Sequence, residues 1–190
     1  MYKRQLLGNE ENGRWRLAPC DPVEHSSRQY LDDTLVLETT WVTATGRARV
    51  LDFMPLSEVN SLVRIVEGLA GETNFEMDLV MRFDYGRSVP WVERLDPLTL
   101  SAVAGPDRLI LRSTVLPHAR DQHTVARFRV GAGERQVFSL CHQPSHLPVQ
   151  PGCDSDEALA QTIDQWQAFA ARCPQVGPYS ALVRLSLIHI

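Results

Sequence analysis

The chain has 190 residues, of which 44% are hydrophobic and 22% charged, a composition typical of a globular protein with one domain or two small ones. Disordered, collagenous and low-complexity classes are therefore excluded. The formal net charge is −4 and the basic residues are scattered singly, so no nucleic-acid partner is expected. The sequence contains neither an apolar run long enough to span a bilayer nor a recognisable signal peptide, so no membrane association is expected. Four cysteines without a Cys-x-x-Cys pair predict free thiols and a cytoplasmic location.

The two ends of the chain are related at the level of their codons. The only lysine, Lys3, lies in the opening Met1 to Gln5. Read from a gtg start codon, these residues can be encoded by gtgtataagagacag, and the reverse complement of that stretch encodes Leu185 to His189. A sequencing adapter ligated to both ends of a DNA fragment produces such an inverted repeat. Residues 1–5 and 185–190 are therefore expected to be adapter-derived, and the chain to be an internal fragment.

The first predicted strands form a hairpin. Leu35–Thr43 is rich in threonine, valine and tryptophan, and Arg47–Met54 follows it after a short turn that contains Gly46. Such a pair of runs joined by a tight turn is typical of two antiparallel strands.

The next two predicted strands are Leu62–Val66 and Phe75–Phe83. In the second of these, every second residue is large and apolar while most of those between are charged, which indicates a strand with one face on a core. The glycine-containing stretch Gly68–Asn74 separates the two runs. They are therefore expected to pair across a turn in that stretch.

More short strands follow at regular spacing, separated by turns at Gly105-Pro106-Asp107 and at Gly131-Ala132-Gly133, the latter expected to be a hairpin. Eight or more such strands predict a mainly β fold, an antiparallel, supersandwich-like β-sandwich over residues 6–150. The later strands are expected at Leu98–Ala104, Leu109–Ser113, Thr124–Val130 and Gln136–Leu140.

After Pro151 the pattern changes to that of one amphipathic helix. Asp154 or Ser155 can cap its start, and acidic residues occupy the first turn. The helix is expected to run to about Arg172 within a linker over residues 151–184. Its predicted apolar stripe consists of Leu159, Ile163, Trp166 and Ala170.

Residues with catalytic or metal-binding chemistry do not form a recognisable motif. Glycoside hydrolysis needs two carboxyl groups across a cleft, and nothing in the sequence brings two of the carboxylates together. Cys141-His142, His146 and Cys153 are of the types that bind zinc, but their spacing is loose and interrupted by prolines. No Gly-x-Ser-x-Gly elbow or phosphate-binding loop occurs. No catalytic residue, metal or cofactor is therefore expected in this chain.

Six sequence blocks resemble, in order and spacing, the N-terminal β-sandwich domain of bacterial family 15 glycoside hydrolases, the glucoamylase and trehalase-like enzymes. The resemblance covers nearly everything from Trp15 to about Arg184. The blocks are Tyr30–Thr40, Val50–Pro55, Leu62–Gly68, Arg82–Gly86, Val89–Trp91 and Ala104–Asp107.

This resemblance implies that the sandwich is followed, in the parent protein, by an α/α toroid of helical hairpins that carries both catalytic glutamates. The parent is then an inverting hydrolase of α-glucosidic bonds, and this chain is its non-catalytic accessory domain. The implied partners are the missing toroid of the same polypeptide and, through the parent enzyme, an α-glucoside substrate.

Four residues are candidates for the substrate rim or for contact with the next domain: Asp84, Tyr85, Trp91 and Trp166. In the structural interpretation, Asp84 caps a turn, Gly86 adopts a positive φ and Tyr85 packs with Trp91. In the functional interpretation, the same loop projects toward the toroid and touches substrate. The stripe that contains Trp166 is expected to be covered by the toroid, by the sheets or by self-association.

Two other classes of function remain open at this stage. A free-standing carbohydrate-binding module requires an exposed row of aromatic side chains on one sheet face, for which Trp41 and Trp91 are the candidates on or beside strands. An interaction or assembly module requires a sheet edge that associates with a second chain.

Overall fold

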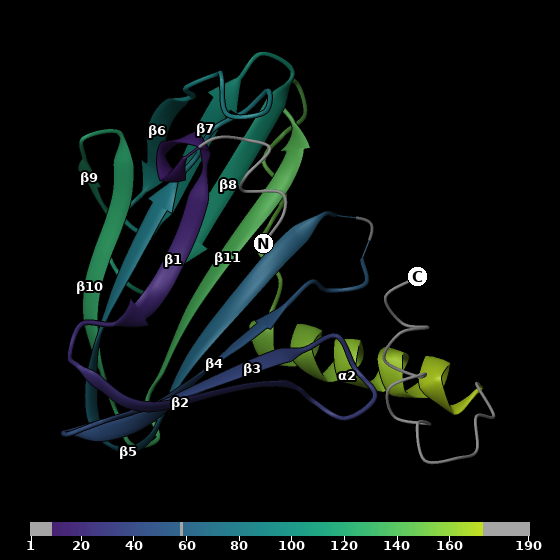
Figure 1. Ribbon diagram of the computed structural model, residues 1–190. Helices are drawn as coiled ribbons and strands as arrows, with labels where there is room; N and C mark the ends of the chain where they lie inside the picture. The colour runs from purple at the N-terminus through teal and green to yellow at the C-terminus, as the bar shows by residue number, and fades with distance from the viewer. Residues whose placement is uncertain (1–8, 58, 173–190) are drawn as a thin grey trace.

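The computed structural model describes residues 9–57 and 59–172 of the chain (Figure 1). Both stretches expected to be adapter-derived, residues 1–5 and 185–190, lie outside the described residues, as does the end of the expected linker. Within the described residues, no helix is long and apolar enough to cross a bilayer.

The fold is an antiparallel β-sandwich with one helix, which confirms the predicted fold class. All strand pairs among the described residues are antiparallel. The larger sheet has, in spatial order, β2 (Val23–Tyr30), β3 (Leu37–Thr43), β4 (Gly46–Phe53), the first half of β5 (Ser61–Val80), β11 (Arg135–Pro144), β8 (Asp107–Ser113), β7 (Thr99–Ala104) and β6 (Trp91–Asp96). The smaller sheet has β1 (Arg14–Pro19), the second half of β5, β10 (His123–Gly131) and β9 (His118–Arg120). A short 3-10 helix, η1 (Glu10–Asn12), precedes β1.

Strand β5 belongs to both sheets. Its first half pairs with β4 and β11, whereas its second half pairs with β1 and β10. The expected hairpin between Leu62–Val66 and Phe75–Phe83 is therefore wrong, because both segments lie on one continuous strand that ends at Val80. The glycines between them bend the strand instead of reversing it.

The bend in β5 is matched by a bend between β10 and β11. The Gly68 N–H donates to the Glu134 carbonyl (3.0 Å), and the Gly133 N–H donates back to the Gly68 carbonyl (2.9 Å). The prediction of a hairpin at Gly131–Gly133 is also wrong, since β10 and β11 pair with different halves of β5 and carry the chain from one sheet to the other. Strands that switch sheets through bends in this way form the corner of a sandwich.

Two hydrophobic cores lie on opposite faces of the larger sheet. Side chains alternate along β4, so that Val50 faces the smaller sheet while Leu51 and Phe53 face away from it. The main core fills the space between the sheets around Phe75 and Phe138, which are fully buried. The second core lies between the larger sheet and the helix.

The helix α2 (Ser155–Ala171) confirms the predicted helix and its start. The Asp154 carboxylate accepts hydrogen bonds from the backbone N–H groups of Asp156 (2.8 Å) and Glu157 (3.1 Å), as an N-cap residue does. In Figure 1, α2 lies at the lower right, near the start of β3 and the end of β4. Its buried small side chain Ala158 contacts the second core, and Leu159 and Ile163 pack against that core from its edge.

The close packing of the sandwich corner can be tested by substitutions at its two glycines. An ideal Cβ on Gly68 lies only 1.9 Å from the Gly131 carbonyl oxygen, whereas a Cβ on Gly131 approaches nothing more closely than the flexible Glu134 side chain at 3.4 Å. Because the first contact is with backbone, Gly68→Ala is expected to lower the free energy of unfolding by about 3 kcal/mol. The matched control Gly131→Ala is expected to change it by less than about 1 kcal/mol. Urea melts with a common m-value measure both; equal effects would contradict the close approach.

Candidate functional site

The four predicted site residues do not converge. Asp84 and Tyr85 have positive φ angles of 46° and 55° in the tight turn after β5, and Trp91 begins the edge strand β6. Trp166 lies on α2, which Figure 1 places well away from β6. The structure therefore offers two separate regions, an exposed aromatic loop at one end and a helix-lined surface at the other.

The aromatic loop is open to solvent. Tyr85 is 79% exposed and Trp91 is 81% exposed, so the expected packing of the two rings on each other is not found. The turn is closed by backbone bonds between Phe83 and Ser88, and the Arg87 N–H donates to the Asp84 carbonyl. Gly86 adopts the expected positive φ, 89°. The loop is thus built by its backbone, and its side chains are available for contact.

The outer face of the larger sheet is covered by the segment that leads into α2. Arg108 donates to the backbone carbonyls of Ser145 (2.6 Å) and Leu147 (2.9 Å), and Arg112 donates to that of Gln150. Both arginines lie on β8. The connection between β11 and α2 is therefore held across the sheet by two guanidinium groups.

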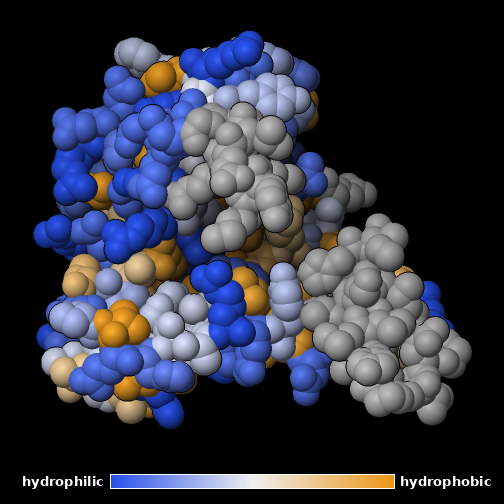
Figure 2. Space-filling model, viewed as in Figure 1, coloured by the Kyte–Doolittle hydropathy of each residue, from blue (hydrophilic) through white to orange (hydrophobic). Residues whose placement is uncertain are grey.

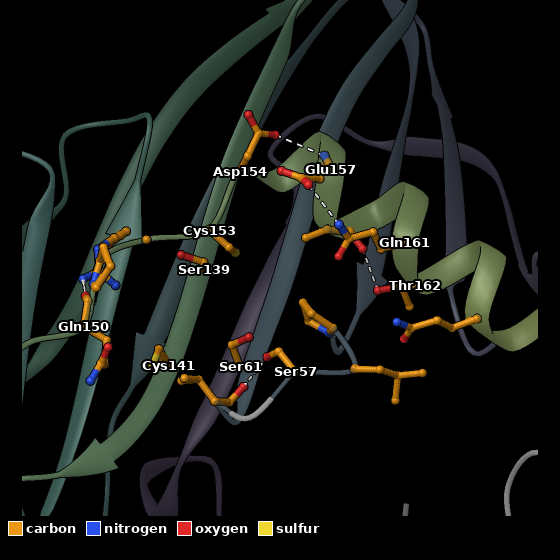
Figure 3. A pocket seen from close by; sticks show the side chains of 18 residues that line it. Ser57, Ser61, Ser139, Cys141, Gln150, Cys153, Asp154, Glu157, Gln161 and Thr162 are labelled. Atoms are coloured by element: carbon orange, nitrogen blue, oxygen red, sulfur yellow. Dashed lines mark hydrogen bonds between the residues drawn. The ribbon is translucent and has the colours of Figure 1, made fainter.

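Between this connection and the helix lies a pocket of about 430 Å³ (Figure 3). We call it the polar pocket after the polar side chains that line it from both sides, although apolar surface forms the larger part of its wall. Side chains from the strands on one side and from α2 on the other point into the space between them. The polar groups that line it are Ser57, Ser61, Arg112, Ser139, Gln150, Asp154, Glu157, Gln161, Thr162 and Gln165, together with Cys141 and Cys153.

The far half of α2 borders a second, mostly apolar groove of about 900 Å³. Trp166 forms part of its wall, and its ring meets Phe169 edge-on with centroids 6.1 Å apart. Met54 and Leu56, in the loop after β4, line the same groove. Met54 is 59% exposed and Leu56 is 50% exposed. The predicted apolar stripe therefore divides: Leu159 and Ile163 cover this domain's own sheet, whereas Trp166 faces an open groove.

An ion-pair chain fixes the first turn of the helix to the sheet. Arg135 contacts both Asp156 of α2 and Glu67 of β5, and Glu67 also binds Arg49 at 2.6 Å. Arg49 in turn binds Glu38 at 2.9 Å. Of these ion pairs, the one between Arg135 and Asp156 connects the network on the sheet to the first turn of α2.

The most buried ionisable cluster lies on the outer face of the smaller sheet. The Asp78 carboxylate, on a residue only 5% exposed, contacts the Arg14 guanidinium and lies 2.9 Å from His123 Nδ1. The other ring nitrogen of His123 is 3.1 Å from Glu11 of η1. Burial alone raises the pKa of Asp78, but the hydrogen bonds from Arg14 and His123 outweigh it and lower that pKa below its ordinary value. The cluster ties η1 to the sheet and has no adjacent cavity among the pockets described above.

The described residues contain no evident site for a metal ion or for an activated thiol. No group of three or more His, Cys, Asp or Glu side chains in this part of the chain is placed to hold a metal ion. Burial raises the pKa of the Cys141 and Cys20 thiols, which keeps them protonated and weakly nucleophilic.

An aromatic row for binding glycan chains is also missing from the described sheet faces. Trp41, one of the two candidates, is packed between the sheets with its ring edge-on to Phe75 at 5.9 Å. Figure 2 shows a mostly hydrophilic surface over β9 and β10, where charged side chains such as Arg127 and Glu76 form ion pairs. Only Trp91 remains as an exposed tryptophan on an outer strand.

The polar pocket was not predicted from the sequence, which pointed to Cys141 and Cys153 only as residues of zinc-binding type and to Asp154 only as a helix cap. The pocket residues come from five segments with no shared spacing, so no motif unites them. Two local patterns in the sequence are consistent with the pocket. Arg112, Ser139 and Cys141 alternate with apolar residues along their strands, so they lie on the face toward the helix. Gln161 and Gln165 share one face of the predicted helix.

The fold is that of a β-sandwich domain whose larger sheet carries a packed helix, with two open cavities beside that helix. The chain belongs to the trehalase-like N-terminal domain family, whose model matches residues 3–139.

Two curated relatives are trehalases. The trehalase of Mycobacterium tuberculosis (strain ATCC 25618 / H37Rv) is 25% identical over 182 residues, and that of Mycolicibacterium smegmatis (strain ATCC 700084 / mc(2)155) is 26% identical over 183. Each alignment covers 82% of this chain but 27% of the relative, so the chain spans about a quarter of their length. Among solved structures, a putative kojibiose phosphorylase from human microbiome aligns with a TM-score of 0.42 and 10% identity, over 93% of this chain and 27% of that one.

The Asp78 cluster predicts a pH-dependent stability. A carboxyl whose folded pKa is lowered stabilises the fold above its unfolded pKa, near 4, and this stabilisation is lost as pH falls through the folded pKa. Asp78→Asn is therefore expected to lower the free energy of unfolding at pH 7 by about 2 kcal/mol. The difference from wild type should shrink below pH 4. Asp32→Asn, at an exposed position, is the matched control, and urea melts from pH 7 to pH 2.5 measure both. A difference that is constant with pH would contradict the assignment.

Proposed function

We propose that this chain is the non-catalytic N-terminal accessory domain of a family 15 glycoside hydrolase that cleaves α-glucosidic bonds, of the glucoamylase or trehalase type. Membership of the trehalase-like N-terminal family supports this proposal, as do two trehalases that are much longer than the chain. The catalytic glutamates are then supplied by an α/α toroid in the same polypeptide. Three free thiols among the described cysteines favour the cytoplasm as its compartment.

The observation that carries the proposal is the open groove beside Trp166. Apolar side chains of Met54 and Leu56 remain exposed there, next to the helix that leads out of the sandwich. Exposed apolar patches of this kind are typical of surfaces that meet another protein surface. We assign the toroid of the same polypeptide as the occupant, so that docking at the groove stabilises the catalytic domain.

The exposed loop at the opposite end provides a second role. Tyr85 and Trp91 have nearly free rings, and an aromatic ring with a polar handle suits contact with a sugar or with the rim of a cleft. We propose that Asp84, Tyr85 and Trp91 help to shape the rim of the active-site cleft.

The chain by itself is expected to lack glycosidase activity. Glycoside cleavage requires a proton donor and an activated water or nucleophile on opposite sides of the bond. The accessory-domain proposal places both groups outside this chain. Purified chain incubated with trehalose or maltose should release glucose no faster than a protein-free blank, in a coupled glucose assay. Release above that blank, scaling with protein concentration, would overturn the non-catalytic assignment.

Docking at the groove predicts an effect of Trp166→Ser that depends on context. In this chain the tryptophan is only partly buried, so the loss of unfolding free energy should be about 1 kcal/mol. In the polypeptide extended by the toroid the loss should be about 2 kcal/mol greater, because the ring is then fully covered.

The measurement is a set of urea melts on both proteins, each with and without the substitution. Trp91→Ser is the matched control: it removes the same ring from an exposed site away from the groove, and it should leave the melt of this chain unchanged. Equal losses for Trp166→Ser in the two proteins would place this tryptophan in the sandwich's own core and refute docking at the groove.

A further inference from the structure

We propose that the polar pocket between α2 and the larger sheet is a binding site for a small, uncharged, polyhydroxylated molecule of the size of a mono- or disaccharide. The pocket adjoins the Trp166 groove, with which it shares Pro55, Leu56 and Ser57, but it is a cavity of its own. The proposal rests on the residue types that line the pocket, on their directions and on its size.

The pocket is lined by planar polar groups from separate segments. The Glu157 carboxylate and the Gln161 amide lie on α2, the Arg112 guanidinium lies on β8, and the Gln150 amide lies on the connection between β11 and α2. Each such group has two polar atoms held at a fixed spacing, which suits two neighbouring hydroxyl groups of one ligand. Their arrival from different directions allows several hydroxyl groups to be bound at once.

Local hydrogen bonds orient these groups and leave capacity for a ligand. The Gln161 amide nitrogen donates to one Glu157 carboxylate oxygen (2.9 Å), which leaves the other carboxylate oxygen and the Gln161 carbonyl as acceptors. The hydroxyl groups of Ser61 and Ser139 line the sheet side of the pocket and can both donate and accept. Figure 3 shows the Glu157 and Gln161 side chains on the helix side of the same space.

The charges in the pocket favour a neutral ligand over an anion. Among the described residues of the lining, Arg112 is the only one with a cationic side chain, and one of its nitrogens already donates to the Gln150 carbonyl. The carboxylates of Asp154 and Glu157 also line the pocket. An anion would meet these two negative charges, whereas a hydroxyl group can donate to the carboxylates and accept from the guanidinium.

The size and the remaining lining also suit a sugar ring. The volume of about 430 Å³ falls within the range of small-molecule sites, roughly 300 to 1,000 Å³. Pro55, Leu56 and Ala158 supply apolar surface against which the C–H groups of a ring can pack. A pocket that is part polar and part apolar matches the two kinds of surface that a sugar presents.

Saturable binding to the whole chain tests the proposal. D-Glucose and trehalose are the probes, each titrated against isotopically labelled protein and followed by NMR chemical shifts. A ligand of 12 to 23 non-hydrogen atoms in such a site is expected to bind with Kd of about 1 mM. Direct binding is measured instead of thermal stability, because sugars at high concentration stabilise folded proteins by exclusion.

Matched variants locate the binding. Gln161→Leu and Ser139→Leu, which remove a polar group from each side of the pocket, should raise the Kd at least tenfold. Gln167→Leu makes the same change on an exposed position of α2 outside the pocket and should leave the Kd unchanged. Each variant is first shown by its urea melt to be folded, and Gln161→Asn serves as a second, milder probe if Ser139→Leu does not fold.

Three results would overturn the proposal: no saturable binding of either sugar up to 50 times the expected Kd, equal weakening by Gln167→Leu, or tighter binding of inorganic phosphate that Arg112→Gln abolishes. The last result would make the pocket an anion site. None of these results depends on docking at the Trp166 groove, which is tested by its own melts, so the two proposals fail separately.

Discussion

The close approach of two backbones at Gly68 and Gly131 is the constraint on which the rest of the structure depends. A single strand, β5, serves both sheets, so the chain must bend sharply without losing its pairing on either side. Only a residue without a Cβ allows the Gly131 carbonyl to come so near to Gly68. Backbone hydrogen bonds join Gly68 to Gly133 and Glu134. They couple the bend in β5 to the bend between β10 and β11. The two sheets are thereby folded over one shared core.

The corner also determines where the functional surfaces lie. Because the first half of β5 stays in the larger sheet, Val63 and Ile65 face outward and form a second apolar surface that α2 covers. The helix reaches it along a connection held by β8 and is oriented by the Glu67–Arg135–Asp156 ion pairs. The polar pocket lies along this helix as far as Gln165, and the apolar groove borders the helix at Trp166. Packing of the sandwich thus positions both candidate sites.

The sequence predicted the elements whose signals are local. Alternation along β4 and β11 and the cap at Asp154 identified strands and helix close to their observed bounds. Strands β2 and β6 were not predicted, because both lie at sheet edges with every residue exposed and so carry no alternation. The segment from Gly68 to Asn74 has the glycine content of a turn. Only the long-range pairing of β5 shows that the chain bends there instead of reversing its direction.

The candidate sites were less predictable than the fold. Trp166 was predicted to share one apolar stripe with Leu159 and Ile163, but it borders an open groove while those two pack on the sheet. The small side chains of Ala158 and Thr162, which are buried, let the first half of the helix approach the sheet closely. That approach separates the part of the stripe used inside the domain from the part left open. The polar pocket joins residues far apart in sequence, and its glutamine side chains are indistinguishable in a linear sequence from an ordinary solvated helix face.

The hold of Arg108 and Arg112 on the connection to α2 has an evolutionary consequence. Both guanidinium groups bind main-chain carbonyl oxygens of Ser145, Leu147 and Gln150, which every amino acid supplies. Side chains in the connection can therefore be substituted without a change in its backbone path. Lysine does not replace Arg108 or Arg112, because its single ammonium group lacks the planar fork of a guanidinium. Sequence drift in related chains should therefore concentrate in the tethered segment and spare the two residues that tether it.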